Sequence, residues 1–214
     1  MGGRCEAETL LAGCDQLGVP LPAGAASRLS RYLDLLEKWN RAYNLTAVRS
    51  RADMVDRHIL DSLAILPHLQ GRRFLDAGSG AGLPGIPLAI CLPERDFVLL
   101  DSNGKKTRFL FQARLALELA NVEVVDARVE AYRPQQPFDG VLSRAFASLS
   151  DMVTLCAHLT SDGARLYAMK GAGPGGETET LREAGLQVTT TILAVPGLDE
   201  QRSLVTIYPR RPAQ

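Results

Sequence analysis

The stretch that decides the fold is Asp76-Ala77-Gly78-Ser79-Gly80-Ala81-Gly82-Leu83-Pro84-Gly85, which follows the short apolar run Phe74-Leu75. An apolar segment ending at Cys91 comes after it. Glycines at such a turn permit positive φ and let a ligand approach the backbone closely. The ligand then meets the amides at the start of the following helix. The stretch therefore predicts a strand, a ligand-binding turn and a helix.

The turn fits two kinds of nucleotide site. Gly80-Ala81-Gly82-Leu83-Pro84-Gly85 matches the dinucleotide fingerprint Gly-x-Gly-x-x-Gly, and Asp101 follows at about the expected 20 residues. That interpretation predicts a nicotinamide-dependent oxidoreductase. Counted from Asp76, the turn is Asp-x-Gly-x-Gly-x-Gly, which resembles the first motif of S-adenosylmethionine-binding methyltransferases. In both interpretations the Asp101 carboxylate accepts hydrogen bonds from ribose hydroxyls.

From Arg72 onward, short β-rich runs alternate with helical segments. Strands are predicted at 74–75, 97–100, 122–125, 138–142 and 164–169, and helices up to 91 and at 105–119, 148–158 and 177–184. This alternation predicts an α/β fold with a parallel sheet and helices on both faces. The runs 188–195 and 203–208 are joined by a short loop and must pair antiparallel. A parallel sheet that ends in an antiparallel hairpin is typical of the class I methyltransferases.

The first 70 residues differ from the rest and indicate helices at about 10–17, 25–40 and 52–68. We expect residues 1–70 to be an N-terminal helical extension and residues 71–214 the methyltransferase domain. Trp39 continues the apolar stripe of the second helix, which favours packing over stacking on RNA bases. His58 and Asp61 are interpreted as tying the third helix to the core.

Three features favour a methyltransferase over an oxidoreductase. An acid, Asp76, precedes the glycines; the last two strands form a hairpin; and the chain has no second half to carry a hydride-acceptor site. The oxidoreductase stays as the alternative, and a non-catalytic binding module with the same fold is the third hypothesis.

Seven further stretches resemble one family. They are 38–46, 57–63, the glycine turn through Pro87, 100–106, 128–130, 143–149 and 169–171, which include Ser143-Arg144-Ala145-Phe146-Ala147-Ser148-Leu149 and Met169-Lys170-Gly171. Together, in order over residues 30 to 208, they resemble the bacterial small-subunit rRNA guanine-N7 methyltransferase family (RsmG, formerly GidB). The resemblance implies a class I, Rossmann-like fold, with S-adenosylmethionine donating a methyl group to N7 of one guanosine in 16S rRNA.

The resemblance also implies a set of site residues. The expected cofactor positions are Gly78, Gly80, Leu83, Asp101, Val129, Glu130 and Arg144. Arg144 is open to several roles, including the cofactor carboxylate, guanine O6 and a phosphate, and its structural alternative is an ion pair with Asp139 or Glu130. Asn44 and Lys170 are candidate substrate residues, for a base edge and a phosphate. Their structural alternatives are a turn cap and a solvated lysine.

No catalytic general base is expected. Guanine N7 has an exposed lone pair and carries no proton, so catalysis would rest on positioning donor and acceptor in line. No metal is expected either, because the four cysteines (Cys5, Cys14, Cys91, Cys156) form no Cys-x-x-Cys pair and have no histidine at zinc spacing. Buried free thiols are the interpretation of these cysteines.

The charge balance limits the partners. There are 24 Lys+Arg and 24 Asp+Glu, which excludes a simple polycation but not a local basic face. Six basic residues fall at predicted strand ends, where this architecture keeps its site: Lys105, Lys106, Arg108, Arg128, Arg144 and Lys170. The longest apolar stretch, 86–92, is far shorter than the roughly 18 residues of a membrane span. We expect a cytoplasmic monomer whose partner is the small ribosomal subunit.

Overall fold

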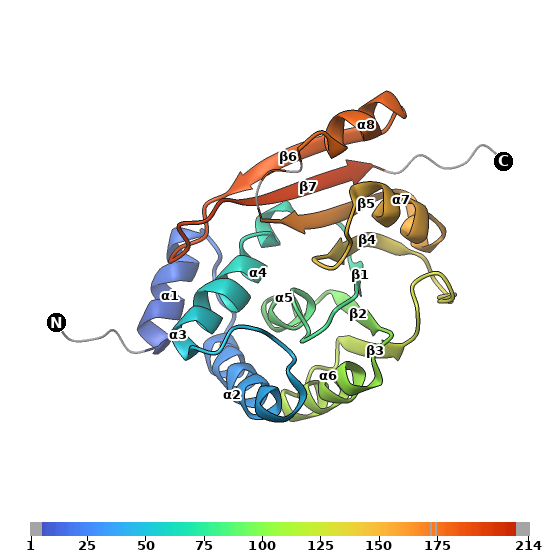
Figure 1. Cartoon of the computed structure of the whole chain (residues 1–214). Coiled ribbons are helices and arrows are strands. Elements are labelled where there is room, and N and C mark those ends of the chain that lie inside the picture. The colour runs from blue at the N-terminus through green and yellow to red at the C-terminus, as the bar shows by residue number, and fades with distance from the viewer. Residues whose placement is uncertain (1–5, 172, 174, 209–214) are drawn as a thin grey trace.

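A seven-stranded sheet forms the centre of the computed structural model, which describes residues 6–171, 173 and 175–208 (Figure 1). Cys5 lies outside the described residues. The strand order is β3-β2-β1-β4-β5-β7-β6. The strands are β1 (Arg73–Ala77), β2 (Asp96–Asp101), β3 (Val122–Asp126), β4 (Phe138–Ser143), β5 (Thr160–Lys170), β6 (Gln187–Leu193) and β7 (Arg202–Tyr208).

The first five strands are parallel, and the predicted antiparallel hairpin of β6 and β7 is confirmed. The structure adds a detail that the sequence did not indicate: β7 lies between β5 and β6 and pairs antiparallel with both. Lys170, the last residue of β5, is in register with Ser203. The start of β7 therefore lies at the edge where the parallel strands end.

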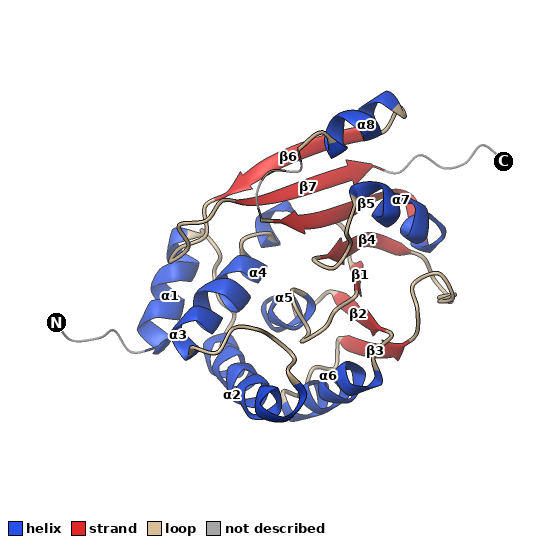
Figure 2. Cartoon of the chain, in the orientation of Figure 1, coloured by secondary structure: helices blue, strands red, loops and turns tan. Residues whose placement is uncertain are grey.

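Helices cover both faces of the sheet, as predicted (Figure 2). Successive strand residues point to opposite faces. Phe74 and Leu99 pack in one buried cluster with α5 (Gly85–Cys91) and α6 (Gly104–Ala116). Leu75 and Val98 pack in another, with α7 (Leu149–Cys156) and α8 (Glu177–Glu183). A 3-10 turn, η3 (Ala157–Leu159), follows α7.

The N-terminal segment is helical, but its third helix is not continuous. The elements are α1 (Glu6–Gln16), α2 (Ala25–Tyr43), α3 (Arg51–Met54), η1 (Val55–Leu60), α4 (Asp61–Leu63) and η2 (Leu66–His68). The predicted helical stretch over 52–68 is confirmed, although η1 is a π-helical segment between α3 and α4, and a turn at 64–65 precedes η2, a 3-10 turn that contains Pro67. The boundary proposed at residue 70 stays a prediction, although these helices share a buried cluster with α5 and α6.

Helix α2 lies directly against the glycine turn. Tyr32 is fully buried, and its hydroxyl donates a hydrogen bond of 2.7 Å to the carbonyl oxygen of Ala81. Trp39 packs on Phe109 of α6 with ring centroids 5.8 Å apart, which confirms the packing interpretation. The N-terminal helices therefore support the turn from one side.

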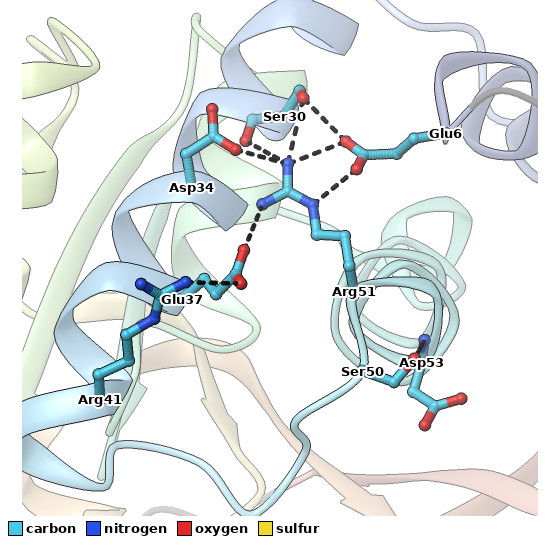
Figure 3. Close-up of polar contacts among 8 residues, drawn as sticks. All are labelled: Glu6, Ser30, Asp34, Glu37, Arg41, Ser50, Arg51 and Asp53. Atoms are coloured by element: carbon cyan, nitrogen blue, oxygen red, sulfur yellow. Dashed lines mark hydrogen bonds and ion pairs between the residues drawn. The ribbon is translucent and has the colours of Figure 1, made fainter.

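A cluster around Arg51 joins α1, α2 and α3 (Figure 3). The guanidinium lies 2.6 Å from Glu6 and 2.8 Å from Asp34, and it donates to the Ser30 carbonyl at 3.0 Å. Glu37 lies 3.8 Å away. The hydrogen bond from Arg51 lowers the pKa of Glu6, against the effect of burial. Glu6 therefore stabilises the fold as a carboxylate.

We predict that Arg51→Met lowers the free energy of unfolding by about 2 kcal/mol at pH 7, the range for hydrogen bonds to charged groups. Because the folded-state pKa of Glu6 is lowered, its contribution is present above the unfolded value and is lost as the pH falls through the folded one. The destabilisation should therefore stay constant from pH 7 to about pH 5 and shrink as the pH falls below 4.5, the unfolded value, measured by urea unfolding.

The matched control is Arg41→Met. Arg41 pairs with Glu37 at 3.3 Å but has 78% of its side chain exposed, so its loss should cost at most about 0.5 kcal/mol. Equal losses for the two variants would contradict a stabilising role for the Arg51 cluster.

Candidate functional site

The turn after β1 depends on three glycines in the left-handed region. Gly78, Gly80 and Gly82 have φ of 74°, 62° and 88°. The amides of Gly78 and Ser79 donate to the carbonyl oxygen of Leu100, at 2.9 and 3.0 Å. The turn is thereby attached to the end of β2. Side chains other than glycine rarely adopt these angles, which explains the glycine pattern of the sequence.

Asp76 holds the turn at both ends. Its side chain is fully buried, and Oδ2 accepts hydrogen bonds from the Ser79 hydroxyl at 2.7 Å and the Gly85 amide at 2.9 Å. Burial raises the pKa of Asp76 to about 6, although the two hydrogen bonds act in the opposite direction. The carboxylate thus ties the start of the turn to the first residue of α5.

Asp101, at the end of β2, is fixed beside the turn. Its Oδ2 accepts from the Gly80 amide and its Oδ1 from the Asn103 amide, both at 2.9 Å. Lys106 lies 3.6 Å from Oδ2. Each carboxylate oxygen can accept more than one hydrogen bond, so Asp101 retains capacity for a ligand hydroxyl.

A pocket opens over the ends of β1, β2 and β3. It brings together four of the residues expected to bind the cofactor: Gly78, Asp101, Val129 and Glu130. Gly80 is adjacent through its hydrogen bond to Asp101. Leu83 is 9% exposed and packs in the buried cluster beneath the turn, so it does not line this pocket.

The residues of this pocket fit a nucleoside-bearing cofactor. A Cβ built on Gly78 would lie 2.7 Å from the Cβ of Ala145, which also lines the pocket. The pocket is therefore narrow between these two residues, and a side chain at position 78 would reduce the space for a ligand. Ala77 and Ala127 are also small, and Asp101 and Glu130 supply carboxylates that can accept from ribose hydroxyls.

Arg144 lies in a second pocket, next to the ends of β4 and β5. Lys170 and Arg202 line it as well, together with the buried Asp61. Arg144 is 3.1 Å from Asp61 Oδ2, and Arg202 is 3.2 Å from Asp61 Oδ1. The alternative prediction, that Arg144 forms an ion pair with Asp139 or Glu130, is therefore wrong.

Asp139 is occupied elsewhere, because its carboxylate accepts from the amides of Arg72 and Arg73 at 2.7 and 3.0 Å. Sequence reasoning also missed the link between Asp61 and Arg202. The available signal was a carboxylate at Asp61 within a buried apolar segment that includes Ile59 and Leu63, because such a charge needs a partner.

His58 has the structural role that the sequence indicated. It is buried, and its Nε2 lies 2.9 Å from the Thr46 hydroxyl, which ties η1 to the segment after α2. Burial lowers the pKa of His58 to about 4. The neutral ring does not line either pocket described above.

The two candidate substrate residues have structural partners. Lys170 is half-buried, with Nζ 3.7 Å from Glu177 and 3.4 Å from the Phe146 carbonyl, so the interpretation as a solvated lysine is wrong. Asn44 is exposed and has φ of 50°. It is the C-cap of α2, which runs to Tyr43 and not only to about residue 40, so Asn44 caps the helix and not a separate turn. It also accepts from Arg49 at 3.0 Å. A role for either residue toward RNA stays a prediction.

The structure has fewer unpaired basic residues at the strand ends than the sequence predicts. Of the six basic residues expected at strand ends, three are close to carboxylates: Lys106, Arg144 and Lys170. The other three are exposed and form no ion pair with the described residues: Lys105, Arg108 and Arg128. Among these six residues, the unpaired cations therefore lie in the first turns of α6 (Lys105 and Arg108) and just after β3 (Arg128).

Within the described ranges, no cluster of three or more His, Cys, Asp or Glu side chains is placed to hold a metal ion. Cys14, Cys91 and Cys156 are free and buried, as expected. Over the same ranges, no helix has the length and apolar character needed to cross a bilayer.

The sheet and its turn define the class of protein. Five parallel strands, β7 antiparallel between β5 and β6, and a glycine turn after β1 form the class I methyltransferase fold. Solved structures share it. DhpI in complex with SAH has a TM-score of 0.57 at 15% identity, covering 88% of this chain and 98% of its own. A SAM-dependent methyltransferase from Aquifex aeolicus has a TM-score of 0.54 at 19% identity, covering 70% and 90%.

The sequence comparisons give the family. The model of the GidB family, rRNA small subunit methyltransferase G, matches residues 25–205. The enzyme of that name from Pseudomonas paraeruginosa is 53% identical over 205 residues, which cover 95% of this chain and 96% of the relative. The Salmonella arizonae enzyme is 52% identical over 193 residues, covering 90% and 93%. The chain belongs to this family, which confirms the resemblance and removes the oxidoreductase alternative.

We predict that Gly78→Ala weakens binding of S-adenosylhomocysteine by about tenfold or more, because about 1.4 kcal/mol of steric cost in the pocket already gives that factor. The control is Gly163→Ala, since Gly163 has φ of 73° and open space around a built Cβ. Both variants should lose about 1–2 kcal/mol of stability from positive φ, and Gly78→Ala should lose more, because its Cβ also meets the Cβ of Ala145. Calorimetric titration and thermal unfolding separate the effects, and equal affinities in the two variants would exclude Gly78 from the binding site.

We predict that Asp76→Asn changes the pH dependence of stability. The pKa of Asp76 is raised from 3.8 to about 6, so the folded state holds a proton longer and loses stability as the pH rises through that window. From pH 4 to pH 7 the variant should gain about 2 kcal/mol relative to the parent chain in urea unfolding. Ser79→Ala removes a hydrogen bond that lowers this pKa, so it should steepen the dependence instead. Parallel curves for all three chains would refute the assignment.

Proposed function

We propose that this protein transfers a methyl group from S-adenosylmethionine to N7 of a specific guanosine in 16S ribosomal RNA of the small subunit. The observation that carries the proposal is the pocket in which Gly78 and Asp101 meet Val129 and Glu130, in a chain of the rRNA small subunit methyltransferase G family. When bound, S-adenosylmethionine supplies the sulfonium methyl group.

The chain's own residues would bind and orient the cofactor. Asp101 would accept from the ribose hydroxyls, fixed by the amides of Gly80 and Asn103. Val129 and Glu130 would lie beside the adenine, because they follow β3 and line the pocket next to Asp101. The proposed cofactor set is Gly78, Gly80, Leu83, Asp101, Val129, Glu130 and Arg144. Leu83 would act from beneath the turn, through its packing.

Proton transfer has no part in the proposed step. Guanine N7 presents a lone pair and no hydrogen, so the site needs to align the base and to exclude water. This requirement agrees with pockets whose described lining contains no histidine.

Further parts of the proposal concern partners and organisation. Asn44 and Lys170 would contact the RNA, the protein would act as a monomer without a metal, and a ribosomal substrate places it in the cytoplasm. Residues 1–70 would form a helical extension that supports the methyltransferase domain at 71–214, through contacts such as Tyr32 with Ala81.

The experiment measures methyl transfer from radiolabelled S-adenosylmethionine to small ribosomal subunits that lack the modification. We expect one methyl group per subunit, located by chain cleavage specific for 7-methylguanosine. The matched control is 16S rRNA transcribed with 7-deazaguanosine, which lacks the N7 lone pair and should accept nothing. Transfer to the deaza substrate would overturn N7 as the acceptor, and absence of transfer to any RNA would overturn the proposed function.

A further inference from the structure

The second pocket is built from parts of the chain that are distant in sequence. Arg144 follows β4, Lys170 ends β5, Arg202 begins β7, and Asp61 comes from α4. The antiparallel direction of β7 brings its first residue to the edge where the parallel strands end. The pocket therefore lies beside the proposed cofactor pocket, across the loop after β4, and Ala145 of that loop lines the cofactor side.

Positive charge exceeds negative charge in this pocket. Its lining has three cationic side chains, Arg144, Lys170 and Arg202, and one carboxylate, Asp61. Asp61 is 3% exposed, and its two oxygens lie between the two arginines. Two further carboxylates approach from outside the lining, Glu177 and Glu200, each only to 3.7 Å from a cation. The pocket therefore favours an anion.

A guanidinium donor remains available in this pocket. Arg202 directs Nε toward Asp61, and its Nη1 lies at the wall by Gly171, 3.5 Å from where a Cβ on that glycine would be. Ser203, the next residue of β7, points to the opposite face of the sheet, so its buried hydroxyl is not counted as a donor.

We propose that this pocket is an oxyanion subsite that binds a backbone phosphate of the RNA substrate, with the Arg202 guanidinium as the donor and Lys170 as a second cation at its wall. Asp61 is a positioning residue that holds the guanidinium groups of Arg144 and Arg202 in place. The subsite rests on the proposed function and deepens it, because it assigns a contact to the nucleotide chain next to the acceptor base.

A phosphate fits better than a guanine base. The Watson–Crick edge of guanine donates from N1 and N2 and requires a free acceptor. The carboxylate of Asp61 is already engaged by two arginines, while guanidinium groups are suited to phosphate oxygens. The carboxylate of the cofactor has the same oxyanion chemistry, and the measurements below distinguish it from phosphate.

The test compares Arg202→Gln with Arg72→Gln in binding to unmethylated small subunits over a range of salt concentrations. Arg72 is the matched control because it is exposed at the start of β1, the opposite edge of the sheet. Arg202→Gln should weaken RNA binding about tenfold and reduce the slope of log K against log salt by about 0.7–0.9, the value for one lost phosphate contact. S-adenosylhomocysteine affinity should not change, and Arg72→Gln should change neither quantity.

Arg202→Lys should keep the salt slope, because it keeps the charge. An unchanged salt slope in folded Arg202→Gln overturns the phosphate subsite. The proposed function is tested separately, because it fails only if the parent chain does not methylate RNA. Loss of cofactor affinity with RNA binding intact assigns the oxyanion to the cofactor carboxylate and overturns the phosphate. Should both Arg202 variants unfold, Lys170→Gln must reduce the salt slope by about 0.7–0.9 at constant cofactor affinity, and no change overturns the proposal.

Discussion

The Asp76 carboxylate, at the end of β1, is the constraint on which the site depends. It is fully buried and accepts hydrogen bonds from both sides of the glycine turn, at Ser79 and at Gly85. A buried carboxylate costs free energy unless donors surround it, and its raised pKa shows that two donors do not fully compensate the burial. Fixing the shape of the turn with this carboxylate therefore lowers the stability of the fold near neutral pH. The amide of Gly80 then reaches Asp101, and the pocket follows from that contact.

The turn is also held from outside the sheet. The hydroxyl of Tyr32 in α2 bonds to the carbonyl of Ala81, and Trp39 of the same helix packs on Phe109 of α6. Since α2 shares its buried cluster with α5 and α6, packing of the N-terminal helices and the shape of the turn are coupled. Helix α4 adds a second connection, because Asp61 orients Arg144 and Arg202. The N-terminal helices therefore contribute to both pockets.

Local patterns were enough to predict the strands, the turn and most helices, because periodicity and glycine spacing are properties of neighbouring residues. The end of α2 is less well predicted: the helix runs to Tyr43, so Asn44 caps it and not a separate turn. The sequence predicts that β6 and β7 pair with each other, but it does not indicate which of the two pairs with β5. In the structure that strand is β7. The partner of Arg144 was missed for a similar reason: Asp61 lies in another helix, and its only local signal was a carboxylate within an apolar segment.

Charge shows most clearly what folding adds to the sequence. Residues 38–57 carry five basic residues and two acids. Acids distant along the chain partly neutralise this segment, because Glu6 pairs with Arg51 and Glu200 with Arg57. A broad positive field would attract any nucleic acid, whereas Arg144, Lys170 and Arg202 are held by carboxylates at the strand ends. On the proposed function, RNA binding then depends on directed contacts at the strand ends, which penalise a substrate whose phosphates lie elsewhere. A neutral chain can thus be a selective RNA enzyme, because selectivity comes from where its few oriented cations lie.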